Sequence, residues 1–520
     1  MIYAQTNRHT AVKSYTTFAK VILLLLLLFM FMGTAGAEET ATSLDLDISN
    51  SNGNPTGNVR DKSYDTKLEY AAGDYISISA KEQIGGVYLI WGYEPVSWSL
   101  SYGSTVRDCG KAGYLHEYIE VTEDTNSITI TFNENAVICD LYVYSKGTLP
   151  EDVQIWQPPC YDMADFLVFS THADDEILFL GGVLAQYGGQ QGLNVQVVYM
   201  THYWNGARIR EHEKLDGLWE SGIKNYPVNM PFDDLYAETL ESAQSIYSYD
   251  ELLTSVTEQI RAFEPMVVVT QDFNGEYGHG GHMILAKAVA EAVDNSGIET
   301  FQPESVATYG VWDVPKTYFH LYPENTLTMD LRQPLSNLGD RTALEVAADA
   351  YLKHVSQQWC WFYVSDDYEY SCAEFGLYRS TVGLDSGIND MFENVISHKE
   401  QNRLEEEEAA KEENEKAMAA LTEAAKQPTP TPETTGKDKS ESTNSDDNQK
   451  AGNGKTIIII ILIVILIAAF AGILIYMNIQ RKRRIQAQKR AAAKRMAERR
   501  AAERSVTERK AERNYTNKRQ

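Results

Sequence analysis

The chain has 520 residues, which is too long for one ordinary domain and suggests two or three. Its hydrophobic content of 43% is typical of a globular protein and excludes a largely disordered one. The last 40 residues hold 16 Lys and Arg against four Glu, so this tail carries a net charge of +12 and the rest of the chain −39. An acidic surface lacks the clustered cations that bind phosphate, so we expect no nucleic-acid partner.

The first 37 residues have the pattern of a secretory signal peptide. A 12-residue apolar run from Val21 to Met32 follows several basic residues and precedes the small residues Ala35-Gly36-Ala37. We expect cleavage after Ala37 and therefore export of the chain. An uncleaved membrane anchor is the alternative, although the run is short for a span.

Residues 38–155 are predicted to form a β-sandwich of the jelly-roll type. Short β-rich segments alternate with turns that contain Gly, Asn and Asp. Four aromatic residues in this region could stack on sugar rings or fill the core of the sandwich, and we favour the core. They are Trp91, Tyr93, Trp98 and Tyr102.

From residue 160 to about 397, predicted strands alternate with predicted helices. Buried-strand patterns occupy residues 166–169, 195–200 and 266–270. This order predicts a Rossmann-like α/β domain with a mostly parallel sheet and helices on both faces. The helices between and after these strands are expected at residues 177–187, 208–222, 250–263 and 283–293.

The C-terminal part of the chain predicts a membrane anchor. A charged helix at 398–426 leads to a stalk at 427–455 rich in Pro, Thr and Ser. The segment 456–478 contains 21 uncharged residues in succession, enough for one transmembrane helix. The basic tail 479–520 follows at once and should stay in the cytoplasm, which places the N-terminal ectodomain outside the cell.

Five cysteines lie outside the predicted span. Export would permit disulfides, and Cys109 with Cys139, and Cys360 with Cys372, are plausible pairs by proximity. That arrangement would leave Cys160 alone. The spacing of the five residues does not determine the connectivity.

Two groups of polar residues follow two of the predicted parallel strands. His172-Ala173-Asp174-Asp175-Glu176 follows the first strand, and His279 and His282 follow the third. Ligands of open parallel sheets bind beyond the carboxyl ends of the strands. We therefore predict a divalent-metal site, with Zn2+ as the first candidate and another divalent ion as the alternative. The acids could instead open the next helix as a cap, but this reading leaves the His pair unexplained.

The segment from about Asp165 to Gln357 resembles the PIG-L/LmbE-like zinc-dependent N-acetylglucosamine deacetylases. That family reads His-Pro-Asp-Asp-Glu after its first strand, then Arg-x-x-Glu on a helix, then Gly-His-x-x-His. Here the corresponding segments are residues 172–176, 210–213 and 278–282. Ala173 replaces the usual Pro, and Gly280-Gly281 replaces a pair in which the family often has an acid.

The resemblance implies a role for each matching residue. Asp174 would be the general base, and His279, as an imidazolium, would stabilise the oxyanion and could protonate the leaving amine. Tyr277 would support the oxyanion or close over the substrate. Arg210 would contact the sugar, with Glu213 orienting it. The implied zinc ligands are His172, Asp175 and His282.

These features predict a membrane-anchored, extracytoplasmic zinc hydrolase that deacetylates N-acetyl amino sugars in a glycan or glycoconjugate. A zinc amidase acting on another acyl-amine is one alternative. A catalytically silent surface protein that binds glycans is another. Two other histidines, His202 and His212, flank the predicted site, and one could line it. Structural or surface roles are expected for four more: His116, His320, His354 and His398.

Overall fold

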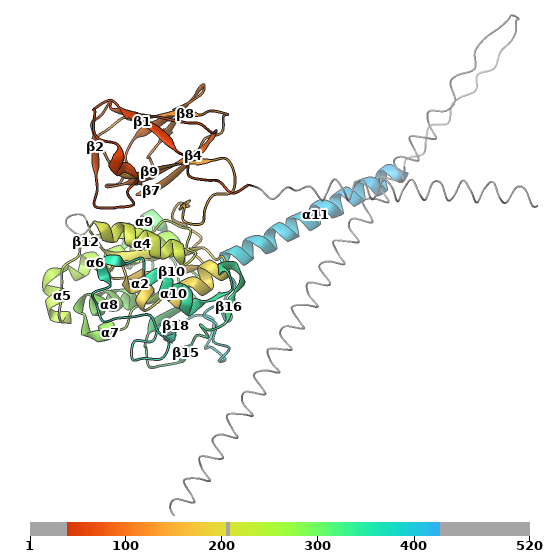
Figure 1. The fold of residues 1–520 in the computed structure, drawn as a ribbon. Coiled ribbons are helices and arrows are strands. Elements are labelled where there is room, and N and C mark those ends of the chain that lie inside the picture. Colours follow the sequence, from red (N-terminus) through yellow and green to blue (C-terminus); the bar gives the residue numbers. More distant parts are fainter. Residues whose placement is uncertain (1–38, 204–207, 427–520) are drawn as a thin grey trace, which may run out of the picture. The chain divides into compact units, whose positions relative to one another are not determined.

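The computed structural model describes residues 39–203 and 208–426, with side chains as far as residue 420 (Figure 1). The predicted signal peptide, stalk, transmembrane helix and basic tail lie outside these residues. Among the residues that are described, no helix combines the length and the apolar character that a membrane span requires.

The N-terminal region consists of two antiparallel sheets that share one core (Figure 1). The strands of the first sheet are, in spatial order, β1 (Leu46–Asn50), β3 (Tyr75–Ala80), β8 (Ser127–Phe132), β5 (Trp98–Tyr102) and β6 (Thr105–Cys109). Those of the second sheet are β2 (Leu68–Tyr70), β9 (Ala136–Ser145), β4 (Ile84–Trp91) and β7 (His116–Glu120), and a short 3-10 helix, η1 (Gly57–Arg60), precedes β2. Alternate residues of β3 and β8 are buried, as expected for strands with one face on a core.

The aromatic residues of this sandwich divide between the core and the surface. The Trp91 and Trp98 rings come from different sheets, lie 5.6 Å apart and are 0% and 1% exposed. Both indole N–H groups donate to Oε2 of the buried Glu117. Tyr102 is buried as well, whereas Tyr93 is 49% exposed. The core interpretation therefore holds for three of the four residues.

The expected cysteine pairs do not form, since all five thiols are free. Cys109 and Cys139 belong to different sheets, and the Cys139 thiol donates instead to the carbonyl of Tyr64. Cys372 is buried, while Cys360 lies in a partly exposed loop. Proximity in sequence was a poor guide for Cys109 and Cys139, because each lies on a strand of a different sheet.

The second region is built on a seven-stranded sheet, which confirms the mixed α/β prediction. Its strands are, in spatial order, β12 (Val228–Asp233), β11 (Val195–His202), β10 (Phe166–Ser170), β13 (Val267–Thr270), β14 (Lys316–His320), β18 (Glu374–Ser380) and β15 (Thr326–Thr328). The first five are parallel to one another, and β18 runs antiparallel to both of its neighbours. Every residue of β10 and β13 is buried, as is usual for strands that are covered on both faces.

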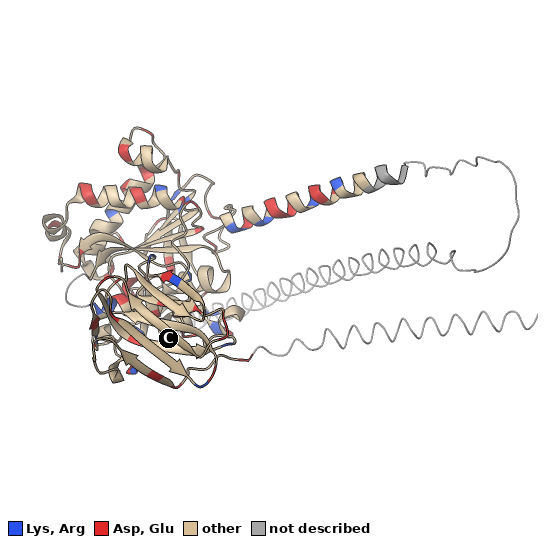
Figure 2. Cartoon of the chain, turned by 90° about the horizontal axis from the view of Figure 1, so that it is seen from above, with Lys and Arg blue, Asp and Glu red and all other residues tan. Residues whose placement is uncertain are grey.

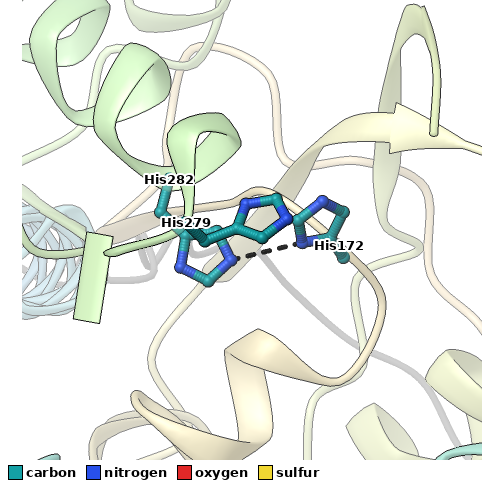
Figure 3. Close-up of side chains that lie close together, drawn as sticks. All are labelled: His172, His279 and His282. Carbon is teal, nitrogen blue, oxygen red and sulfur yellow. Dashed lines mark hydrogen bonds between the residues drawn. The ribbon is translucent and has the colours of Figure 1, made fainter. Parts of the chain in front are cut away.

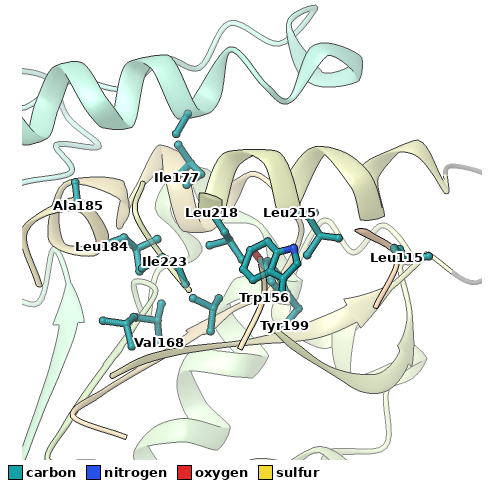
Figure 4. Packing of buried hydrophobic residues seen from close by; sticks show 14 of the residues in the cluster. Leu115, Trp156, Val168, Ile177, Leu184, Ala185, Tyr199, Leu215, Leu218 and Ile223 are labelled. Atoms are coloured by element: carbon teal, nitrogen blue, oxygen red, sulfur yellow. The ribbon is translucent and has the colours of Figure 1, made fainter. Parts of the chain in front are cut away.

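Helices cover both faces of this sheet. Alternate residues of β10 belong to two separate apolar clusters, one on each side. Figure 4 shows part of the first cluster, to which Val168 of β10 and Leu184, Leu215 and Leu218 belong. The helices are α2 (Asp175–Leu178), α3 (Gly181–Val183), the π-helical η2 (Leu184–Gln190), α4 (Ile209–Glu220), α5 (Leu240–Ile246), α6 (Tyr249–Phe263), α7 (Gly275–Gly278), α8 (Gly280–Asn295), α9 (Pro303–Tyr309) and α10 (Ala343–Tyr351).

One predicted helix, at residues 177–187, is broken into α2, α3 and η2. The first break lies at Leu180, whose φ of −125° and ψ of 0° are not helical, and Gly181 and Gly182 follow it in close contact with other elements. A Cβ atom on Gly181 would lie 2.9 Å from Ala347 Cβ, and one on Gly182 would lie 2.3 Å from Leu331 Cδ1. The two glycines of α3 thus let α10 and Leu331 approach the backbone directly after the break.

The remaining elements close the region and lead away from it. A small hairpin and two 3-10 helices complete it: β16 (Pro334–Leu335), β17 (Arg341–Thr342), η3 (Ser336–Leu338) and η4 (Val355–Gln357). The stretch expected to be a charged helix is α11 (His398–Lys426). Figure 2 shows acidic and basic residues along its length. Arg403 pairs with Glu400 and Glu407 on this exposed surface.

The sandwich packs against α4. Tyr64 donates to Asp216 Oδ2 at 2.6 Å, and Gln154 donates to Asp216 Oδ1 at 2.6 Å. His116 Nε2 lies 3.0 Å from His212 Nδ1, and both rings are buried. Burial lowers the pKa of each histidine, so both rings are neutral near pH 7.

Candidate metal centre and active site

The two predicted polar segments meet because the strands before them are adjacent. β10 and β13 are parallel neighbours, so their carboxyl ends lie at the same edge of the sheet. The Thr171 backbone N–H and hydroxyl both donate to Gln271 Oε1, which ties the loop after β10 to the loop after β13. In Figure 3 the side chains of His172, His279 and His282 point toward one another.

Three of the predicted ligand atoms form a compact triangle. Asp175 Oδ2 lies 2.8 Å from His172 Nδ1 and 3.0 Å from His282 Nε2. The two nitrogen atoms are 3.3 Å apart. Ligand atoms placed tetrahedrally around zinc at ~2.0–2.1 Å would be separated by about 3.3 Å, so the triangle has the dimensions of one face of such a site.

The hydrogen bonds of His282 also favour a cation between its Nε2 atom and Asp175. Its Nδ1 lies 2.6 Å from Glu276 Oε2, and a carboxylate can only accept, so Nδ1 carries the proton. The Nε2 lone pair of the neutral ring then faces the Asp175 carboxylate. Burial alone would lower the pKa of His282, but the carboxylates of Asp175 and Glu276 raise it to about 10. Positive charge is therefore stabilised at this position. A divalent ion held by neutral imidazole and carboxylate satisfies the same demand.

His279 lies beside the triangle. The candidate ligand atoms of His172, His279 and His282 all lie within 4.8 Å of one another. His279 is also the N-cap of α8, where its Nδ1 accepts from the Gly281 N–H at 3.1 Å, so its remaining proton is on Nε2. Because Nε2 carries a proton, we assign the third ligand to Asp175 and keep His279 as a donor.

The protonation expected for His279 differs from what the structure favours. Burial and the neighbouring rings of His172 and His282 lower its pKa to about 3. The ring is therefore neutral near pH 7 in this arrangement, not the imidazolium that the sequence resemblance implied. A neutral ring still offers its Nε2–H to an oxyanion.

Asp174 occupies an unusual backbone position next to a ligand. Its φ of 124° is uncommon for a residue with a side chain and marks local strain. Its Oδ1 accepts from Arg210 Nη2 at 2.9 Å, and its N–H donates to Glu176 Oε2 at 2.8 Å. Burial, assisted by Asp175 and Glu176, raises the pKa of Asp174 to about 7 against the opposing charge of Arg210. A carboxylate with this pKa suits general-base catalysis at neutral pH.

The two predicted substrate-binding residues have protein partners in the structure. Arg210 donates to Asp174 and to the Ala173 carbonyl and lies 4.6 Å over the Tyr203 ring, so it holds the carboxylate of Asp174, the residue predicted to be the general base. The Glu213 carboxylate accepts from the N–H and hydroxyl of Ser356, at 2.7 and 2.6 Å. Glu213 thus anchors η4, a role different from the one expected.

Tyr277 lies at the mouth of the site. It is 39% exposed, and its ring centroid is 5.9 Å from that of His279 and 5.5 Å from that of His282. This position leaves its hydroxyl available to a bound substrate.

Sequence reasoning missed a layer of buried residues behind the ligands. Glu276 bridges His282 and His320, whose Nδ1 lies 3.0 Å from Glu276 Oε1. His354 is fully buried and faces Glu176 Oε1 at 3.4 Å. His320 and His354 had been assigned surface or general structural roles. The position of Glu276 in the segment that leads to His279 and His282 was an available signal, since acids near ligating histidines often support them.

Comparison with known proteins finds similarity to one enzyme family. Residues 167–293 match the profile of the PIG-L family, described as GlcNAc-PI de-N-acetylase. A curated relative from Catenulispora acidiphila, 1D-myo-inositol 2-acetamido-2-deoxy-alpha-D-glucopyranoside deacetylase 1, is 25% identical over 208 residues, which is 34% of this chain and 60% of the relative. The corresponding deacetylase of Rhodococcus opacus is 27% identical over 32% of this chain and 64% of its own. The chain thus spans less than two thirds of the length of these relatives.

Solved structures give weaker likenesses. The N,N'-diacetylchitobiose deacetylase from Pyrococcus horikoshii is 18% identical, with a TM-score of 0.30 over 38% of this chain and 71% of its own. A module named CpGH89CBM32-6, from Clostridium perfringens, is 14% identical, with a TM-score of 0.17 over 19% of this chain and 94% of its own.

Proposed function

We propose that the chain is a zinc-dependent deacetylase of N-acetyl amino sugars, because residues 167–293 match the PIG-L family. The observation that carries the proposal is the triangle of His172, Asp175 and His282 with Asp174 beside it. The named relatives act on a 2-acetamido sugar, which supports the substrate class.

The metal has a defined place in this scheme. His172, Asp175 and His282 would hold it, and when bound it supplies a Lewis acid that activates water and polarises the acetamide carbonyl. The buried surroundings of these residues strengthen every electrostatic interaction with the substrate.

The residues beside the ligands would move the protons. Asp174 takes a proton from the attacking water on Oδ2, because Arg210 already occupies Oδ1. His279 donates its Nε2–H to the developing oxyanion, and the loss of one such donor typically costs about 10²–10³ in rate. Asp174 then returns its proton to the leaving amine, which completes deacetylation.

The test is acetate release from N-acetylglucosamine and its conjugates by the full chain with zinc. We expect one acetate and one free amine per turnover, and loss of both in Asp174→Asn with zinc still bound. A folded, zinc-loaded protein that releases no acetate from any of these sugars would refute the proposal.

We further propose that the site works outside the cell on an anchored chain. The supporting features are in the sequence alone: the signal-peptide pattern at its start and the apolar segment 456–478 with a basic tail after it. Protease added to intact cells should remove the N-terminal region and spare the tail. Protection of the N-terminal region in intact cells, with cleavage only after lysis, would refute this placement.

A further inference from the structure

A line of aromatic rings leads from the mouth of the site to an exposed loop. The Tyr277 ring lies 4.4 Å from that of Phe362, and the Phe362 ring lies 4.1 Å from that of Trp361. Tyr370 adjoins Trp361 at 6.0 Å. We call Phe362, Trp361 and Tyr370, with the neighbouring Trp359, the aromatic strip. It belongs to the loop between η4 and β18.

The outer residues of the strip face solvent. Trp359 is 81% exposed and Trp361 is 62% exposed. Among the residues that the structure describes, these are the two most exposed tryptophans, whereas Trp91 and Trp98 are buried. Exposed apolar groups that gather beside a site, instead of being scattered singly, commonly mark a binding surface.

Hydrogen bonds and one ion pair hold the loop in place. Asp366 accepts two hydrogen bonds from Arg332, at 2.7 and 2.5 Å, and the Tyr368 hydroxyl donates to the Tyr363 carbonyl at 2.9 Å. The Ser371 carbonyl accepts from His320 Nε2 at 2.9 Å, which connects the end of the loop to the residues behind the ligands. A surface ordered before binding loses less entropy when its ligand arrives.

The charges around the strip argue against an anionic ligand. Asp367 and Glu369 belong to the same loop and would repel phosphate or an acidic lipid surface, whereas the charge of Asp366 is balanced by Arg332. Flat, uncharged aromatic faces instead suit the apolar faces of pyranose rings, which carry C–H groups. The continuity of the rings from Tyr277 to Trp361 means that a chain of sugars bound at the metal would extend over them.

We propose that the aromatic strip is a subsite for the sugar residues adjoining the one that is deacetylated. The substrate is then an oligosaccharide or polysaccharide of N-acetyl amino sugars. This inference rests on the proposed function for the reaction, and the aromatic strip is the evidence that the substrate has more than one sugar.

The experiment compares kcat/KM for tetra-N-acetylchitotetraose with that for N-acetylglucosamine in the full zinc-loaded chain. We expect the parent to prefer the tetrasaccharide and Trp361→Ala to lower this preference about ten-fold, the usual scale for truncating an aromatic anchor. Trp361→Phe should restore part of it. Tyr309→Ala, an exposed aromatic residue (42%) on α9, is the matched control and should behave as the parent.

A second readout separates this inference from the proposed function. The tetrasaccharide is titrated into Asp174→Asn with and without Trp361→Ala, and tryptophan fluorescence is followed. A saturable change that requires Trp361 supports the subsite even if no acetate is ever released. Equal preference ratios in parent and Trp361→Ala would overturn it. So would a Trp361-dependent change with phosphatidylglycerol vesicles and none with the tetrasaccharide, since a membrane surface would then be the ligand.

Discussion

Replacing Glu276 by Gln should weaken zinc binding without changing any predicted ligand. The Glu276 side chain is fully buried, with Oε2 2.6 Å from His282 Nδ1. Its Oε1 accepts from the Asp272 N–H at 2.9 Å and lies 3.0 Å from His320 Nδ1. Gln has one oxygen, so its amide N–H₂ must face a donor on one side or the other. It also removes the charge that makes His282 a stronger ligand.

The magnitude follows from the loss of a carboxylate behind a ligating imidazole. Such changes typically reduce metal affinity about 10–100-fold, or ~1.4–2.7 kcal/mol. Zinc affinity is measured by competition with a chromophoric chelator. Glu291→Gln, at a residue of α8 that accepts from Tyr249 of α6, is the matched control. If the affinities of the two variants agree within about two-fold, a measure of ~0.4 kcal/mol, Glu276 does not tune the site and the reasoning fails.

Three further outcomes are expected. His279→Ala should cut kcat about 10²–10³-fold with zinc content unchanged, and loss of zinc would instead make His279 a ligand. Burial lowers the pKa of His212 in the folded chain, so only the unfolded state gains a proton there as pH falls below about 6.5, and the free energy of unfolding should drop by up to ~1.4 kcal/mol per pH unit. Urea titrations at pH 7 and 5 measure this drop, which should be smaller in His212→Asn. An equal drop in the parent and the variant would contradict the prediction. Gly280→Ala should lower the melting temperature, because the new Cβ would lie 2.0 Å from the Thr239 carbonyl oxygen, whereas Gly57→Ala meets no atom within 4 Å and serves as the control.

The parallel sheet was predictable because its strands are short apolar runs, and a run such as β10 is typical of a strand that is buried on both faces. Helix boundaries were less accessible. The break at Leu180 precedes Gly181, which packs against Ala347, a residue far away in sequence. The predicted helix at 283–293 begins three residues earlier, at Gly280, because His279 caps it. Local patterns do not contain such tertiary contacts.

The site shows the same division. The meeting of His172 and His282 follows from the topology of adjacent parallel strands, so spacing and strand order were enough to predict it. The partners of Arg210 and Glu213 were not predictable, because side-chain hydrogen bonds depend on the final packing. Glu276 was missed because its φ of 53° turns the backbone in a way that no periodicity signals.

Helix α4 couples two parts of the chain that look independent in sequence. Arg210 near its start holds the general base, while Asp216, farther along, accepts hydrogen bonds from Tyr64 and Gln154. Deleting the first 150 residues would thus remove Tyr64 and expose a polar, formerly covered side of the helix that steadies Asp174. Attempts to produce the α/β region alone, or to join it to another N-terminal domain, should therefore keep or redesign the contact between α4 and the sandwich. In evolutionary terms, gain or loss of the sandwich would require matching changes in α4.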